Sequence, residues 1–152
     1  MQCEKLLKFL IFFLVIQVNF VSVNAEEYFL TLRNNTTNLR QGPSFDYPIK
    51  IFYKKKYLPV LIIDSSDNFR KIKDHENNTG WIHVSQLKKS NSIISLDDKI
   101  LFTKPTVFSK PLAKIKKGRL LVIKKCSSNW CKITTNEFNG WIEAKNIWGS
   151  IN

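Results

Sequence analysis

The stretch from Thr79 to Leu87 reads Thr79-Gly80-Trp81-Ile82-His83-Val84-Ser85-Gln86-Leu87, and the chain repeats it near its C-terminus. The second copy is Asn139-Gly140-Trp141-Ile142-Glu143-Ala144-Lys145-Asn146-Ile147, so the two Gly-Trp-Ile steps lie 60 residues apart. A fixed spacing of this order indicates a duplicated structural unit. The sequence therefore predicts two small, related units in tandem.

Residues 1–25 have the pattern of a secretory signal peptide. Lys5 and Lys8 give a basic start, residues 9–16 form a short apolar run, and small or β-branched residues lead up to Ala25. Such a signal would direct the chain to the periplasm or cell envelope, with cleavage after Ala25. The alternative is an uncleaved N-terminal membrane anchor, although the apolar run falls short of the roughly 20 residues that span a bilayer.

The chain is strongly basic. Its formal net charge is +12, and removal of residues 1–25 lowers it to +11. Such a charge attracts anionic partners, and an exported protein would meet anionic lipid, lipopolysaccharide or an acidic polymer rather than nucleic acid. The lysine pairs are spread over both units, which is typical of solvated faces rather than of a nucleic-acid-binding arm. Codon composition offers a second explanation, because Lys, Asn, Ile and Phe are all abundant and all have A/T-rich codons.

Short β-prone runs separated by turn residues fill both units. In the first unit, residues 26–87, the expected strands are 28–32, 49–53, 59–63, 69–73 and 80–82. The second unit, residues 98–152, repeats this order at 99–102, 112–115, 119–123, 130–133 and 140–142. Close, even spacing of short strands predicts an all-β fold of two small β-barrels, which hide the edges that an open sheet exposes. The polar segment 88–97 is expected to be the linker between them.

Two cysteines follow the signal segment, and both lie in the second unit. Cys126 and Cys131 flank a short turn, at a spacing that fits facing positions of an antiparallel hairpin, and an oxidising compartment favours a disulfide between them. At the matching place in the first unit stand Asp64 and Arg70. We expect a cross-strand ion pair there instead of the bridge.

Several of these motifs resemble the bacterial SH3-like (SH3b) domain family. The first unit has Asn38-Leu39-Arg40-Gln41-Gly42-Pro43-Ser44, then Phe69-Arg70-Lys71-Ile72 and Gly80-Trp81-Ile82, similar to a family pattern of N-x-R-x-G-P-S, W-x-x-V and a terminal G-W-V. The second unit resembles the family through residues 126–133 and Gly140-Trp141-Ile142. The resemblance implies tandem five- to six-stranded SH3-like barrels in an exported protein. It also implies a binding or spacing module of the kind often attached to cell-wall hydrolases.

Five aromatic residues are the candidates for ligand binding. Phe69 and Trp130 alternate with core isoleucines, so each should start on the outward face of its barrel, and Tyr47 follows the Gly-Pro turn. Outward aromatic rings offer large contact area to a sugar or a peptide. The alternative is that these rings cover the open end of a barrel or the contact between the units. Trp81 and Trp141 occupy a repeated position, which favours a packing role for them.

These features favour a non-catalytic, exported envelope protein that binds peptidoglycan, as glycan or wall peptide, or an envelope protein. The alternative is a basic surface protein that associates electrostatically with anionic lipid or lipopolysaccharide. An enzyme is the least favoured class, because His75 and His83 show no triad spacing with a nucleophile. No four-ligand metal spacing exists in the sequence, and we expect no catalytic residue, metal or cofactor.

Overall fold

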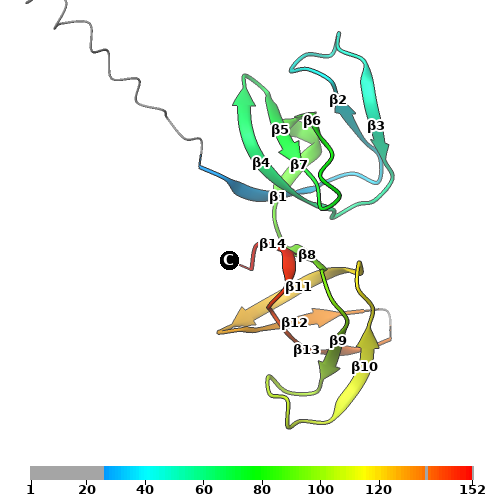
Figure 1. The fold of residues 1–152 in the computed structure, drawn as a ribbon, viewed down its shortest axis with the longest axis vertical. Coiled ribbons are helices and arrows are strands. Elements are labelled where there is room, and N and C mark those ends of the chain that lie inside the picture. Colours follow the sequence, from blue (N-terminus) through cyan, green and yellow to red (C-terminus); the bar gives the residue numbers. More distant parts are fainter. Residues whose placement is uncertain (1–25, 136, 152) are drawn as a thin grey trace, which may run out of the picture.

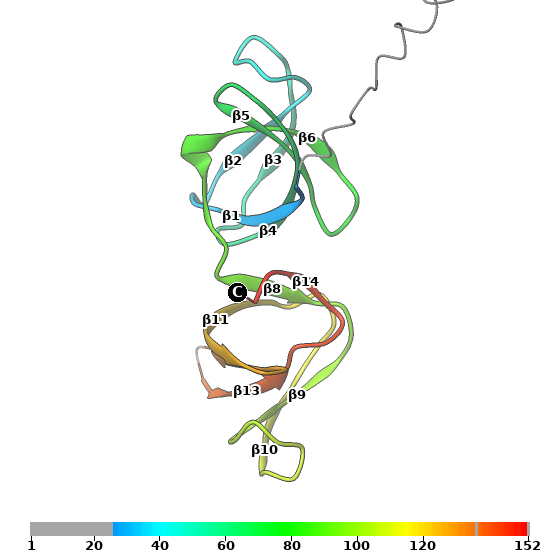
Figure 2. The same ribbon diagram turned by 90° about the vertical axis from the view of Figure 1, so that its left-hand side faces the viewer.

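The computed structural model describes residues 26–135 and 137–151, and the signal peptide predicted for residues 1–25 lies outside this range. The described chain forms two all-β units that lie one above the other (Figure 1). Each unit contains one seven-stranded sheet that curls round on itself into a barrel (Figure 2). The predicted all-β tandem fold is confirmed.

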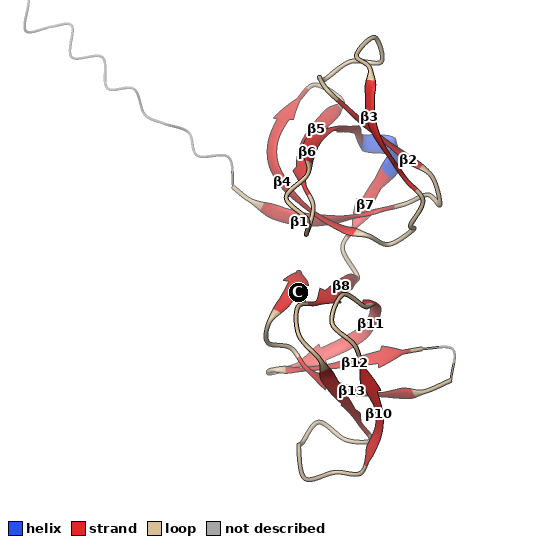
Figure 3. Cartoon of the chain, turned by 45° about the vertical axis from the view of Figure 1, so that its right-hand side comes forward, coloured by secondary structure: helices blue, strands red, loops and turns tan. Residues whose placement is uncertain are grey.

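The first sheet has the strand order β3-β2-β6-β5-β4-β1-β7, with antiparallel neighbours throughout. Its strands are β1 (Tyr28–Leu32), β2 (Thr37–Arg40), β3 (Ile49–Tyr53), β4 (Pro59–Ser66), β5 (Phe69–Lys73), β6 (Thr79–His83) and β7 (Leu87–Lys89). The 3-10 turn η1 (Val84–Gln86) joins β6 to β7 and is the short blue segment of Figure 3. Within the described residues, no helix has both the length and the apolar character needed to span a membrane.

The second sheet has the order β10-β9-β13-β12-β11-β8-β14, which is the first order with seven added to each strand number. Its strands are β8 (Ser92–Ser95), β9 (Lys99–Phe102), β10 (Pro111–Ile115), β11 (Leu120–Ser127), β12 (Trp130–Thr134), β13 (Asn139–Glu143) and β14 (Ile147–Gly149). The registers also match, since Ile72 faces Gly80 in the first unit and Ile133 faces Gly140 in the second. The predicted duplication is confirmed.

The segment 88–97, predicted to be the linker, connects the two units and contributes a strand to each of the two sheets. Most of it is strand: β7 pairs with β1 in the first sheet, whereas β8 pairs with β11 and β14 in the second. Ser92 and Ser95 are buried, and their hydroxyls donate to the carbonyl oxygens of Tyr57, at 2.5 Å, and Lys116, at 3.2 Å. These hydrogen bonds allow polar residues to enter a buried strand, which composition alone does not reveal.

Strand β8 contributes to the hydrophobic cores of both units. Ile94 packs with Leu32 and Ile72 in the first core, and Ile93 packs with Leu101 in the second. Both isoleucines are fully buried. Successive side chains of a strand point to opposite faces, so one strand can supply neighbouring residues to two separate cores.

Strand β14 also joins the two barrels, through Trp148. The Trp148 Nε1–H donates to the carbonyl oxygen of Pro59 at 3.0 Å, and the indole meets the ring of Phe29 edge-on, with centroids 5.3 Å apart. Trp148 and Leu120 both pack against the first core. The units therefore share a packed interface instead of hanging on a flexible connection.

The predicted disulfide is confirmed. Cys126 and Cys131 are directly opposite each other on β11 and β12, with a Cα–Cα distance of 4.1 Å. The side chain of Cys131 is fully buried in the second core. A bridge that closes so short a loop contributes roughly 2 kcal/mol.

The ion pair expected between Asp64 and Arg70 is wrong. The register irregularity between Ile62 and Asp64 places Ser65 opposite Arg70 and sets Asp64 opposite Lys71. The Arg70 guanidinium instead donates to the carbonyl oxygen of Asp67 at 2.9 Å. A bulge shifts register by one residue, so counting along the sequence selects the wrong partner.

Candidate functional site

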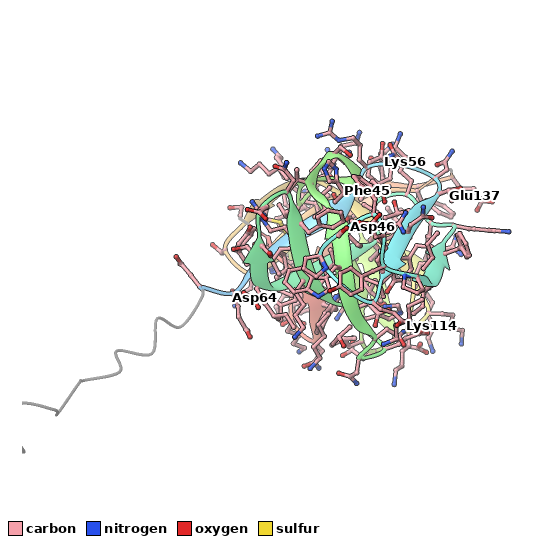
Figure 4. The ribbon with its side chains drawn as sticks, turned by 90° about the horizontal axis from the view of Figure 1, so that it is seen from above. Phe45, Asp46, Lys56, Asp64, Lys114 and Glu137 are labelled. Atoms are coloured by element: carbon pink, nitrogen blue, oxygen red, sulfur yellow. A yellow bond between two sulfur atoms is a disulfide. The ribbon has the colours of Figure 1, made fainter. Side chains whose placement is uncertain are left out.

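The outward face of the first barrel carries an aromatic cluster of Phe45, Phe69 and His83. Their ring centroids are 5.2 Å apart for Phe45 and Phe69, and 5.1 Å for each of the other two pairs. Phe69 and His83 face each other on β5 and β6, and Phe45 comes from the loop 41–48. Figure 4 views this end of the molecule and shows Phe45 and Asp46 projecting over the barrel.

The loop 41–48 is fixed in place by Arg40 and Gly42. The Arg40 guanidinium donates to the carbonyl oxygens of Phe45 at 2.9 Å and Tyr47 at 2.8 Å, and lies 5.4 Å from the centroid of the Phe45 ring. A Cβ on Gly42 would come within 2.5 Å of the Tyr47 ring, so only glycine lets that ring lie against the backbone. The Arg and the Gly of the N-x-R-x-G-P-S motif therefore both shape this loop.

The structure brings three of the predicted candidates to this face. Phe69 and Trp81 share it, because Lys71 faces Trp81 in the register and alternation puts Phe69 on the same side of β5 as Lys71. Tyr47 borders it from the loop and is 46% exposed. Phe69 is on the outward face, as predicted, but is only 6% exposed because Phe45 and His83 cover it. Phe45, in contrast, is 60% exposed and is the ring of the cluster most open to solvent.

Sequence reasoning missed Phe45, Arg40 and His83 as site residues. Phe45 sits in a loop without strand alternation, so no periodicity assigns it to a face. Its approach to β5 depends on hydrogen bonds from Arg40 to the loop. The signal that could have found it is the Arg within the N-x-R-x-G-P-S motif, because a guanidinium can bind two carbonyl oxygens at once.

The second barrel presents a different surface. Phe102 faces Trp141 in the register, at the place where Arg40 faces Trp81 in the first barrel. The Phe102 ring packs edge-on against Trp130, with centroids 5.8 Å apart. Trp130 and Trp141 are both half-buried on the outward face. They lie on a separate barrel from Phe69 and Trp81, so the five predicted residues form two surfaces rather than one site.

A cleft of about 530 Å³ also opens beside β10 and β11 of the second barrel. Leu101, Ala113 and Leu121 are among its apolar lining residues, and Lys114 and Arg119 among its cations. In the first barrel, Tyr53 occupies the place of Ile115, because it ends β3 as Ile115 ends β10. The Tyr53 hydroxyl reaches the loop between β5 and β6 by donating to Asp74 Oδ2 at 2.8 Å.

His83 and Ser85 are hydrogen bonded, with His83 Nδ1 2.8 Å from Ser85 Oγ. The same nitrogen accepts the backbone N–H of Ser85 at 3.3 Å, so His83 caps the turn η1. This is the geometry of a local capping contact. Among the described residues, no three His, Cys, Asp or Glu side chains gather closely enough to hold a metal ion.

Asp74 is the buried acid of the first barrel, at 1% exposure. Burial alone would raise its pKa, but hydrogen bonds from Asn78 and Tyr53, together with the backbone N–H groups of Asn78 and Glu76, favour the carboxylate and lower the pKa below its usual value. Burial and the hydrogen bond to Asp74 raise the pKa of Tyr53. Asp74 is therefore ionised and Tyr53 neutral at pH 7.

The Asp74 network predicts acid sensitivity of the first barrel. The pKa of Asp74 is lower in the folded chain than in the unfolded one. Its contribution to the stability of the fold is therefore complete above about pH 4 and is lost as the pH falls further. The free energy of unfolding can be measured by urea titration at pH values from about 3 to about 7, on both sides of the usual pKa of an aspartate. It should fall at the acid end of this range. Asp74→Asn should flatten this dependence and cost roughly 1–3 kcal/mol at neutral pH.

Asp67→Asn is the matched control, because Asp67 is an exposed turn residue. It should retain the full acid dependence. An Asp74→Asn variant with the same loss of stability in acid as the unchanged chain would assign the sensitivity to other groups.

Two solved structures show a weak similarity to the chain. The chain is similar to NlpC2 from Trichomonas vaginalis at 12% identity and TM-score 0.37, covering 82% of this chain and 49% of that one. It is also similar to an NlpC/P60 family protein from Bacillus cereus ATCC 10987 at 12% identity and TM-score 0.37, covering 80% and 57%. The chain thus spans about half the length of these proteins. No curated protein sequence matches it.

The family comparison covers more than half of the chain. Residues 33–89 and 99–149 each match the bacterial SH3 domain. The first match runs from just before β2 to the end of β7, and the second from β9 to β14. The two matched segments therefore correspond to the two barrels, and the chain belongs to the bacterial SH3 domain family, with two copies of the domain in tandem.

Proposed function

We propose that the chain is a non-catalytic binding protein whose first barrel binds peptidoglycan across the aromatic cluster. Bacterial SH3 domains are binding modules, which supports binding rather than chemistry. The single observation that carries the proposal is Phe45, a 60% exposed ring held on a rigid base of Phe69 and His83. Trp81 and Tyr47 extend the same face.

Physical chemistry supports this choice of surface. A small barrel has little core to spare, so an aromatic ring left in water gives up stabilisation that burial would provide. The Phe45 ring is also pre-organised, because Arg40 binds the backbone carbonyl oxygens of Phe45 and Tyr47. A ring held in its binding position loses little entropy on binding and can stack on a sugar ring or a peptide. The positive charge of the chain attracts the carboxylates of wall peptides.

The test is retention of the chain by purified, insoluble peptidoglycan. Phe45→Ala should reduce the apparent affinity by about tenfold or more, as expected for a central aromatic anchor. Phe52→Ala is the matched control, since Phe52 is also 60% exposed but lies on β3, opposite Asn38, outside the aromatic cluster. Equal losses for the two variants, or no retention of the unchanged chain, would reject the proposal. Loss on Trp130→Ala alone would move the site to the second barrel.

A further inference from the structure

The loop between β9 and β10, residues 103–110, carries an apolar tip formed by Val107 and Phe108. Val107 is 57% exposed and Phe108 is 96% exposed. The loop lies at the end of the second barrel that is farthest from the first, at the bottom of Figures 1 and 2. The most exposed large apolar side chain of the described residues therefore stands at one pole of the molecule.

Polar groups of the loop itself hold this tip in place. The Thr103 N–H donates to the Lys110 carbonyl oxygen at 3.0 Å, and the Thr106 N–H donates to the Lys104 carbonyl oxygen at 2.8 Å. The Ser109 hydroxyl lies 3.1 Å from the same Lys104 oxygen. The backbone thus has its own hydrogen bonds, and the loop presents the Phe108 ring without relying on it for packing.

The matching loop of the first barrel shows that its geometry does not require an apolar residue at the place of Phe108. The Gln41 N–H donates to the Pro48 carbonyl oxygen at 3.1 Å, just as Thr103 does to Lys110. Asp46 stands where Phe108 stands, because the Asp46 N–H bonds to Ser44 Oγ as the Phe108 N–H bonds to Thr106 Oγ1. The same backbone accepts a charged residue at this place, so the loop conformation does not depend on the phenylalanine.

Two lysines flank the apolar tip. Lys104 and Lys110 stand on either side of it in the loop, and both are exposed. Lysine keeps its ammonium in water or among phosphates while its stem lies along apolar surface. Apolar residues between basic ones are typical of segments that enter the interface of an anionic bilayer. The net charge, +12 − 1 = +11 without residues 1–25, adds attraction at longer range.

We propose that the loop 103–110 is a membrane-surface anchor. Val107 and Phe108 enter the interfacial layer of an anionic phospholipid bilayer, and Lys104 and Lys110 bind the headgroup phosphates. An apolar pocket of a partner protein is the competing occupant. The flanking cations favour the bilayer, because anionic headgroups surround any inserted ring and neutralise both ammonium groups at once. This inference does not depend on peptidoglycan binding by the first barrel.

The test is flotation with vesicles of phosphatidylcholine alone or mixed equally with phosphatidylglycerol. The flotation test uses residues 26–152, so that the apolar run 9–16 does not itself bind lipid. This part of the chain contains both hydrophobic cores. It should bind the anionic vesicles at least tenfold more tightly than the neutral ones. Phe108→Asp, which copies the first barrel, should weaken this binding about tenfold. Lys104→Gln with Lys110→Gln should remove most of the preference for anionic lipid.

Phe45→Ala is the control, because Phe45 lies on the other barrel and should leave vesicle binding unchanged. Conversely, Phe108→Asp should leave retention by peptidoglycan unchanged, so that failure of one proposal does not imply failure of the other. Binding of Phe108→Asp at the strength of the unchanged protein would overturn insertion and leave electrostatic association alone. Absence of binding to anionic vesicles would overturn the membrane assignment altogether.

Discussion

Replacement of Gly80 by alanine is expected to unfold the first barrel at much lower urea concentration than in the unchanged chain. A Cβ at Gly80 would lie 2.7 Å from the carbonyl oxygen of Arg40 and 2.7 Å from Leu39 Cγ. Arg40 pairs with Trp81 where β2 crosses β6, so the obstructing oxygen belongs to backbone that cannot turn aside. Overpacking of this kind costs on the order of 1–3 kcal/mol, a large share of the stability of so small a barrel.

The same collision exists in the second barrel, and it provides an internal repeat of the experiment. A Cβ at Gly140 would lie 2.6 Å from the carbonyl oxygen of Phe102 and 2.8 Å from Leu101 Cγ. Gly118→Asn is the control, because Gly118 has φ +80° and no atom within 4 Å of its missing Cβ, and asparagine tolerates this backbone conformation. Gly80→Ala and Gly118→Asn with equal urea midpoints would show that the strands separate easily at the crossing.

Replacement of Trp148 by alanine should separate the unfolding of the two barrels. The change removes the hydrogen bond to Pro59, the edge contact with Phe29 and the packing against the first core. Because Trp148 is half-buried, the cost should be roughly 2–4 kcal/mol, below the upper end for a fully buried tryptophan. Scanning calorimetry should show one transition for the unchanged chain and two for the variant.

Trp141→Ala is the control for Trp148→Ala. Trp141 is also a half-buried tryptophan of the second barrel, but it lies on β13 and packs away from the first core. Trp141→Ala should lower the unfolding temperature of the second barrel without changing the coupling between the two barrels. A single, cooperative transition in Trp148→Ala would mean that the remaining contacts, those of β8 and of Leu120 with the first core, are enough to couple the units.

The positions of most strands could be predicted from local pattern. Runs such as Pro59–Ile63 and Phe69–Lys73 alternate or cluster β-prone residues between turn residues, and strand formation depends first on these short-range features. The disulfide could also be predicted from local pattern, because the β11–β12 hairpin alone brings Cys126 and Cys131 together. Part of the candidate face followed from the same logic, since alternation assigns Phe69 to the outside.

The predictions that failed depend on backbone geometry that strand alternation does not describe. The ion pair of Asp64 with Arg70 failed because a bulge shifted the register by one residue. The sequence-based prediction did not include Phe45, because this loop residue reaches a strand only through the Arg40 hydrogen bonds that fold the loop back. No local period records the bulge or the fold of this loop. His83 could have been included, since strand alternation places it on the same face as Trp81.

The sequence by itself therefore determined that this protein is a duplicated all-β chain, because repeated Gly-Trp-Ile steps and strand alternation are properties of short segments. Only the tertiary structure decided that the apparent linker contains strand β8 and that Ile93 and Ile94 of this strand enter different cores. It also decided that Trp148 packs one barrel against the other. The physical reason is that a buried polar strand is stabilised by hydrogen bonds and apolar contacts from distant segments. These partners exist only once both barrels have folded.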